Sequence, residues 1–114
     1  MNLAYKIISK QFWNGLLCSG DLKDKRTGFI HLSTRSQLAN RMKKYVNRRG
    51  HVLLCIDLLR IPHGKVKWEG TSTGTGPSSH IIDAPHIYGK FGIDSVVWSK
   101  KITRRLIHRV IHNS

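Results

Sequence analysis

The strongest constraint on the fold is the segment Val52–Ile56, an uninterrupted apolar run between His51 and Asp57. A strand with one solvated face alternates apolar and polar side chains, whereas a continuous apolar run indicates a strand covered on both faces. We therefore expect this segment at the centre of a sheet. The chain has 114 residues, the usual length of one domain, and its 39% hydrophobic residues suffice for one core.

Alternation and capping patterns predict the elements that precede this strand. Tyr5–Ile8 is predicted to be an opening strand, and Ser9 is predicted to cap a short helix that ends at Gly20. The apolar face expected of this helix consists of Phe12, Trp13, Leu16 and Leu17.

The segment Gly28–Ser33 is predicted to be a second strand. Side chains alternate between the two faces of a strand, so Phe29, His31 and Ser33 share one face. Thr34 then begins a helix over residues 34–49, because the T-x-x-Q pattern that starts there is a capping box. The buried stripe expected of this helix consists of Leu38, Met42, Tyr45 and Val46.

A further short strand is predicted at Val66–Glu69, with Val66 and Trp68 facing the core and Glu69 on the other face. The stretch Gly70–Ser79 is rich in Thr, Ser and Gly, which favours a loop over regular structure. A loop of this length in a small domain leads us to the hypothesis of a lid over a binding site.

The C-terminal part of the chain is predicted to contain a last strand, Asp94–Trp98, and a basic helix capped by Thr103. The expected fold is α+β, with a small mixed, mostly antiparallel sheet of about five strands and two or three helices. We expect residues 100–114, the basic helix, to belong to the same domain as residues 1–99.

The chain carries 20 Lys and Arg against 6 Asp and Glu, a formal net charge of +14. Such a field attracts anions, so nucleic acid or another polyanion is an expected partner through the basic faces of helices 34–49 and 103–112. The residues that form these faces are Arg41, Lys44, Arg48, Arg104, Arg105 and Arg109.

Several classes of protein are not expected. Cys18 and Cys55 lack the paired spacing of zinc ligands, so we expect no metal and two buried, reduced thiols. The sequence shows no membrane span, no secretory signal and none of the glycine-rich motifs of NTPases or dinucleotide-binding folds. These features favour a cytoplasmic protein.

The candidate site residues are His31, Ser33, Glu69, His86 and Tyr88. Imidazole is the side chain most easily tuned for proton transfer near neutral pH, and Ser33 lies just before a helix N-terminus that can receive an anion. Glu69 is the only glutamate. Pro85 and Gly89 fix the backbone from which His86 and Tyr88 project, and a simple turn with a buried Tyr88 is the alternative. Asp83 is a candidate to orient His86.

Three segments carry a resemblance to a known family. Gly28–Thr34, Val66–Glu69 and Pro85–Gly89 resemble, in this order, the hallmark motifs of the bacterial domain-of-unknown-function family 952. The similarity runs from about Tyr5 to Trp98.

That family is grouped by fold with the ADP-ribosyltransferase-like proteins, which include RNA 2'-phosphotransferases. The resemblance implies an ADP-ribosyltransferase-like fold that binds NAD or a related ribonucleotide. His31, Ser33 and the neighbouring Thr34 would then contact a ribose, and Tyr88 or Trp68 would stack on the nicotinamide or adenine ring.

The catalytic candidates are His31, His86 and Glu69. The late glutamate of the superfamily has no clear counterpart, because Glu69 precedes the predicted loop. If the chain is an enzyme, we expect an ADP-ribosyltransferase-like or RNA phosphotransferase-like transferase. Two alternatives stay open: a nucleic-acid-binding module that uses the basic surface, and RNA phosphotransfer by the His31 and His86 pair.

Overall fold

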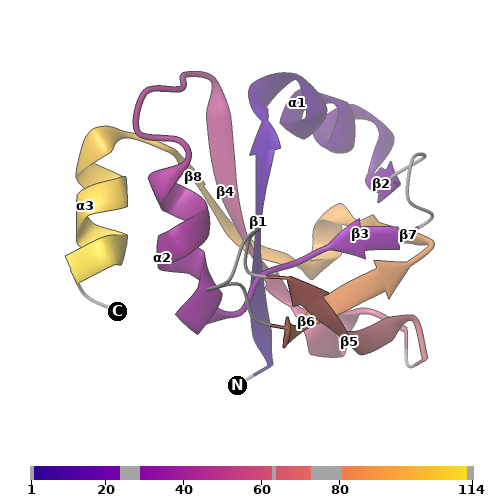
Figure 1. Cartoon of the computed structure of the whole chain (residues 1–114). Coiled ribbons are helices and arrows are strands. Elements are labelled where there is room, and N and C mark those ends of the chain that lie inside the picture. Colours follow the sequence, from indigo (N-terminus) through magenta and orange to yellow (C-terminus); the bar gives the residue numbers. More distant parts are fainter. Residues whose placement is uncertain (1, 24–28, 63, 73–80, 113–114) are drawn as a thin grey trace.

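The computed structural model describes residues 2–23, 29–62, 64–72 and 81–112. Its main layer is a three-stranded antiparallel sheet (Figure 1), in the order β1 (Leu3–Ser9), β4 (His51–Asp57) and β8 (Val96–Lys101). All residues from Val52 to Ile56 are buried. This confirms the expectation of a central strand covered on both faces.

A second three-stranded antiparallel sheet lies across the first in the order β3 (Phe29–His31), β6 (Ile81–Tyr88) and β5 (Val66–Ser72). A short ribbon pairs β2 (Asp21–Lys23) with β7 (Lys90–Gly92). The α+β class is confirmed, and all of these pairs are antiparallel. The prediction of a single sheet of about five strands is wrong. Six strands form two separate sheets, and β2 and β7 form the ribbon in addition.

Strand β6 runs through Pro85, so the alternative of a simple turn at this segment is wrong. Proline has no N–H to donate to a ladder, so a central strand normally excludes it. The Pro85 carbonyl accepts from the Leu32 N–H at 3.0 Å, just beyond the His31–His86 pair that ends β3. The missing N–H therefore falls where the β3 ladder already stops, and β6 tolerates the proline.

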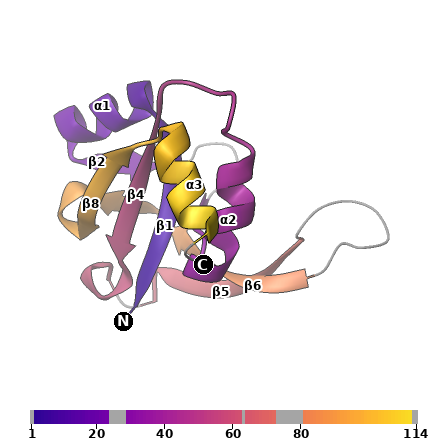
Figure 2. The same ribbon diagram turned by 90° about the vertical axis from the view of Figure 1, so that its left-hand side faces the viewer.

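The two faces of β4 belong to two apolar cores. Figure 2 shows α1 on one side of this strand and α2 and α3 on the other. The first core joins Leu54 and Ile56 to helix α1 (Lys10–Ser19) and to Ile30 and Ile87 of the second sheet. The second core joins Leu53 to the remaining two helices, α2 (Arg35–Lys43) and α3 (Arg104–His112). Helices α2 and α3 thus share one face of the main sheet, as the hypothesis of a joint basic surface requires.

Helix α1 begins and ends as predicted, with Ser9 accepting from the Phe12 N–H at 3.1 Å and Gly20 in the left-handed region at φ 81°. Its expected apolar face is only half correct. Leu16 is buried and Trp13 packs against the first core, but Phe12 and Leu17 are 64% and 54% exposed. Successive helical residues are turned by about 100°, so the pair three apart faces the sheet while the flanking residues point away.

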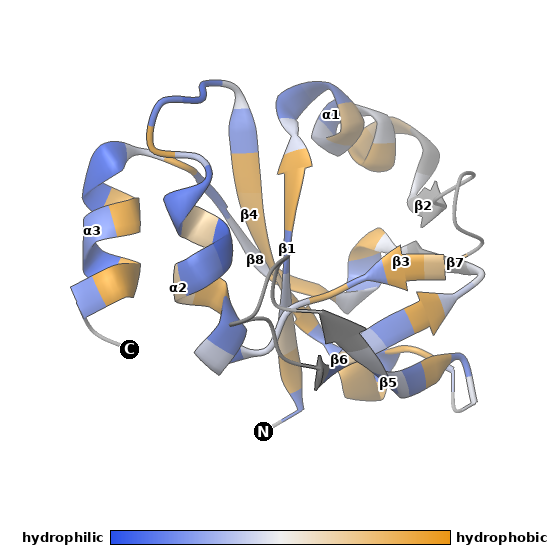
Figure 3. Cartoon of the chain, in the orientation of Figure 1, coloured by the Kyte–Doolittle hydropathy of each residue, from blue (hydrophilic) through white to orange (hydrophobic). Residues whose placement is uncertain are grey.

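The capping box that begins α2 is present: Thr34 Oγ1 accepts from the Gln37 N–H, and Gln37 Oε1 accepts from the Thr34 N–H. The helix ends at Lys43, before the predicted stop, and Val46 beyond it is exposed. Helix α3 begins as predicted, with Thr103 Oγ1 accepting from the Leu106 N–H at 3.1 Å. Its apolar positions face α2 and its hydrophilic positions face away (Figure 3).

Other expectations need correction. Strand β5 extends to Ser72, so the first residues of the expected loop at Gly70–Ser79 are paired with β6. The rest of the hypothesised lid, residues 73–79, lies outside the described residues. Trp68 is 54% exposed instead of facing the core. Cys55 is buried as expected, but Cys18 on α1 is exposed. No helix in the described ranges is long and apolar enough to cross a membrane.

Two short 3-10 helices complete the architecture. They are η1 (Leu58–Arg60), which follows β4, and η2 (Ile93–Ser95), which precedes β8. The predicted last strand therefore begins later than expected, because Asp94 belongs to η2.

Candidate functional site

The register of the second sheet brings predicted site residues to one face. His31 of β3 lies opposite His86 of β6, and Phe29 lies opposite Tyr88. Across β6, Lys67 of β5 lies opposite His86, and Glu69 lies two residues further along. Directly opposed side chains in a sheet point to the same side. We call the resulting surface the polar face, and its residues are Phe29, His31, Lys67, Glu69, His86 and Tyr88.

Glu69 is the hydrogen-bonding centre of the polar face. Its Oε1 accepts from the Tyr88 hydroxyl at 2.5 Å and lies 2.9 Å from His86 Nδ1. The Tyr88 hydrogen bond, followed by the one from His86, lowers the pKa of the Glu69 carboxyl from its ordinary value of 4.5. The same hydrogen bond raises the pKa of Tyr88 from its ordinary value of 10.0. Near neutral pH the pair is therefore a carboxylate and a protonated phenol.

The ionised state of Glu69 fixes the tautomer of His86. A carboxylate can only accept hydrogen bonds, so Nδ1 of His86 must carry the proton and donate it. The His86 side chain is 5% exposed, and its buried Nε2 has no hydrogen-bond partner among the described residues. In the neutral ring Nε2 is a hydrogen-bond acceptor. Buried acceptors in proteins normally have a hydrogen-bond donor as partner.

His31 is the more accessible of the two histidines. Its ring meets that of His86 edge-on, with 4.7 Å between ring centroids, and the side chain is half-buried. His31 is therefore the histidine that an external molecule can reach, whereas His86 is buried and lies 2.9 Å from Glu69 Oε1.

The Phe29 ring packs against the rings of three other residues of the polar face. Its ring centroid is 4.7 Å from that of His31, 4.6 Å from His86 and 5.2 Å from Tyr88. Contacts of this kind restrict ring rotation and present an aromatic surface. The ammonium of Lys67 lies 5.0 Å from the centre of the Tyr88 ring, which places a positive charge at the edge of that surface.

Hydrogen bonds from β1 and α2 fix the two strands that carry His31 and His86. Lys6 Nζ donates to the His31 carbonyl at 3.1 Å, and Tyr5 and Ser33 exchange two backbone hydrogen bonds of 2.8 Å. Gln37 Nε2 donates to the Asp83 carbonyl at 2.9 Å and so ties the first turn of α2 to β6. The main sheet and α2 together set the position of the polar face.

The structure brings together four of the candidates, namely His31, Glu69, His86 and Tyr88. Ser33 lies at the junction between β3 and α2, and the Thr34 hydroxyl is engaged in the helix cap. Trp68 alternates with Glu69 along β5 and lies on the opposite face of the sheet, away from Tyr88.

Asp83 does not orient His86, contrary to the prediction. Asp83 precedes His86 by an odd number of residues along β6, so its side chain points to the opposite face, and it is Glu69 that holds the ring. Sequence reasoning did not count Phe29 and Lys67 as site residues. The signal was available, since alternation already placed Phe29 beside His31. Within the described ranges, no three His, Cys, Asp or Glu side chains are grouped so that they could hold a metal ion.

Comparisons with known proteins identify the fold and a family. The family model described as "Protein of unknown function (DUF952)" matches residues 7–99. The crystal structure of protein CC0527 from Caulobacter crescentus is similar, with a TM-score of 0.73 and 24% identity over 89% of this chain and 86% of that one. Its solution NMR structure gives a TM-score of 0.69 and 27% identity over 90% and 85%. No curated protein matches the chain.

Proposed function

The chain belongs to the DUF952 family of proteins of unknown function, and on the geometry of its polar face we propose that it binds a ribonucleotide there. One observation carries the proposal: three strands bring an engaged carboxylate, two imidazoles and two aromatic rings into mutual contact. A nucleotide combines a flat ring, hydroxyl groups and phosphate, and the polar face offers a partner for each.

Each part of the ligand has a chemical counterpart. Oε1 of Glu69 is engaged by Tyr88 and His86, so Oε2 is the oxygen that would accept from a ribose hydroxyl. The half-buried rings of Phe29 and Tyr88 would contact the base, and the Lys67 ammonium at their edge would attract phosphate.

NAD is the first ribonucleotide to test. The resemblance to ADP-ribosyltransferase-like proteins implies a ribose contact by His31 and Ser33. Of these, His31 belongs to the polar face, and Ser33 lies two residues further along the chain, where it pairs with β1. Binding has stronger support than transfer. His86 is almost fully buried, which disfavours the alternative of His31 and His86 as an exposed acid–base pair in RNA phosphotransfer.

Calorimetric titration of the chain with NAD and with AMP tests the proposal. His31→Ala is expected to weaken binding about tenfold, because a buried hydrogen bond to a ligand contributes about 1.4 kcal/mol. Trp68→Ala is the matched control, since it removes an exposed aromatic ring from the opposite face.

Binding at the polar face is also expected to depend only weakly on salt, because hydrogen bonds and ring contacts carry most of it. Absence of binding by both ligands at millimolar concentration would overturn the proposal. So would an equal loss of affinity in the two variants.

A further inference from the structure

A cavity of about 600 Å³ lies at the end of the main sheet where β1 ends and β4 begins, between the segment after α2, the start of α1 and the junction of β8 with α3. None of its lining residues belongs to the polar face. Its cationic lining residues come from four separate segments, and they are Lys10, Arg48, Arg49, Lys101 and Arg104. No acidic residue lines the cavity. We call it the basic cavity.

These five cations have no carboxylate to neutralise them within the part of the chain that the structure describes. The sequence explains why: it contains no Asp or Glu from residue 25 to residue 56 or from residue 95 to the last residue. The charged residues of α2, α3 and the segments beside them are therefore all basic. Like charges held around one cavity repel each other, and an anion placed there relieves that repulsion.

The walls of the cavity are fixed by the backbone. The Lys10 N–H donates to the Gly50 carbonyl at 2.7 Å, and the Ile102 N–H donates to the His51 carbonyl at 3.0 Å. Gly50 has φ 77°, a left-handed conformation that side-chain-bearing residues rarely adopt. The guanidinium of Arg48 lies 5.4 Å from the centre of the Tyr45 ring, which restricts its position.

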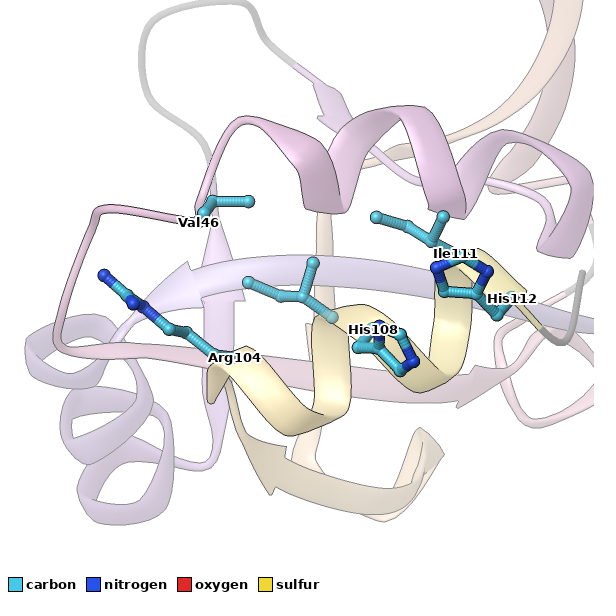
Figure 4. Close-up of a pocket in the computed structure, with 6 residues that line it drawn as sticks. Val46, Arg104, His108, Ile111 and His112 are labelled. Atoms are coloured by element: carbon cyan, nitrogen blue, oxygen red, sulfur yellow. The ribbon is translucent and has the colours of Figure 1, made fainter.

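An apolar groove continues from the basic cavity along α3. The two share Val46, Arg104 and Ile107, and the groove adds Ile111 and the rings of His108 and His112. Figure 4 shows Arg104 at the start of α3, pointing away from the two histidines. The histidine rings lie 4.2 Å apart between centroids. Cations therefore occur at one end of a continuous surface, and apolar and aromatic side chains at the other.

We propose that this surface binds single-stranded nucleic acid, with the backbone phosphates in the basic cavity and unstacked bases along the groove of α3. A single phosphate would use only some of five cations, whereas a phosphodiester chain supplies charges in series. Single-strand binding combines a basic track with ring or apolar contacts to the bases. This inference is independent of ribonucleotide binding at the polar face.

The test is fluorescence anisotropy with a labelled single-stranded RNA of about twelve nucleotides, measured over a series of salt concentrations. The variant Arg48→Gln/Arg104→Gln removes two charges from the basic cavity. Removal of two phosphate contacts is expected to flatten the slope of log K against log salt by about 1.4. The matched control, Lys43→Gln/Lys65→Gln, removes the same charge from exposed positions outside the cavity.

The expected result is a weaker affinity and a flatter slope in the cavity variant than in the control. Equal losses in both variants would show that net charge alone attracts RNA, and this would overturn a localised site. Equal affinity for a double-stranded RNA of the same length would contradict the role of the groove. Binding to vesicles with anionic lipid but not to RNA would replace the proposal by a membrane surface. His31→Ala is expected to leave the salt slope unchanged, which separates this test from that of the polar face.

Discussion

At the scale of single residues, the chemistry of the polar face depends on how Glu69 is held. Its Oε1 lies within hydrogen-bond distance of two different side chains, and the ionised carboxylate accepts from both because it has no proton to donate. Protonation of Glu69 removes the reason for His86 to keep its proton on Nδ1. Glu69 and Tyr88 are coupled, because the hydrogen bond that lowers the pKa of the carboxyl raises the pKa of the phenol.

We predict that Glu69→Gln changes the pH dependence of stability. The native pKa of Glu69 is depressed, so its contribution is present above the unfolded value of 4.5 and is lost as pH falls through the native pKa. The difference in the free energy of unfolding between parent and variant should therefore be larger near neutral pH than at about pH 3. Urea unfolding at both pH values measures it.

The control for that prediction is Asp83→Asn, which removes an exposed carboxylate on the opposite face of β6. It is expected to show no such dependence. A Glu69→Gln difference that is the same at both pH values would contradict the account of the depressed pKa.

Most residues of the polar face can be predicted from the sequence because strand alternation is a local property. Alternation places His31 on the same face as Phe29, and Glu69 on the outward face of its strand, without knowledge of the pairing. The contact between Glu69 and His86 could not be predicted, because it depends on the register between β5 and β6. Asp83 was the predicted partner of His86 because the two are close in sequence. Alternation along β6 excludes Asp83, but the sequence did not identify this segment as a strand.

At the scale of elements, the capping box of α2 connects helix stability to the candidate site. Thr34 directly follows Ser33, which pairs with β1, and Gln37 of the same box reaches the Asp83 carbonyl of β6. The first turn of α2 thus links both sheets. A change in this turn is expected to move the end of β3.

We predict that Thr34→Ala destabilises the chain by about 1 kcal/mol, the usual effect of losing an N-cap hydroxyl. It should also weaken NAD binding, because the junction next to His31 becomes less ordered. Thr103→Ala is the matched control, since it removes the equivalent cap from α3 at a distance from the polar face. Thermal unfolding and calorimetric titration of both variants test this, and equal effects on NAD affinity would contradict it.

The elements that sequence reasoning placed correctly have strong local signals. The caps at Ser9, Thr34 and Thr103 were each found from their hydroxyl side chains. Strand β6 was not found, because proline normally marks a turn and only the end of the β3 ladder makes Pro85 acceptable. Long-range pairing also decided that the strands form two sheets instead of one, and a single sequence carries no local record of this.

At the scale of the whole molecule, β4 separates two cores that are built from different parts of the chain. Leu54 points into the first core with α1 and the second sheet, and Leu53 points into the second core with α2 and α3. The basic cavity lies at the His51 end of this strand, and none of its lining residues belongs to the polar face. Because β4 contributes to both cores, loss of packing on either side is expected to affect overall stability.

We predict that Leu54→Ala lowers the free energy of unfolding by about 2–5 kcal/mol, the usual range for a fully buried leucine. Leu59→Ala is the control, because its side chain is 75% exposed and its loss should change stability by less than about 0.5 kcal/mol. Urea unfolding of both variants provides the measurement. Similar values for the two would show that the first core is not packed as described.

The strand order of the main sheet also has a consequence for synthesis on the ribosome. Strand β1 is made first, but its partner β4 begins at His51. At about 5–20 residues per second, β1 waits on the order of seconds before it can pair. Its apolar residues Ala4 and Ile8 are exposed to other nascent chains and to chaperones for that interval, and the second edge of β4 stays open until β8 follows.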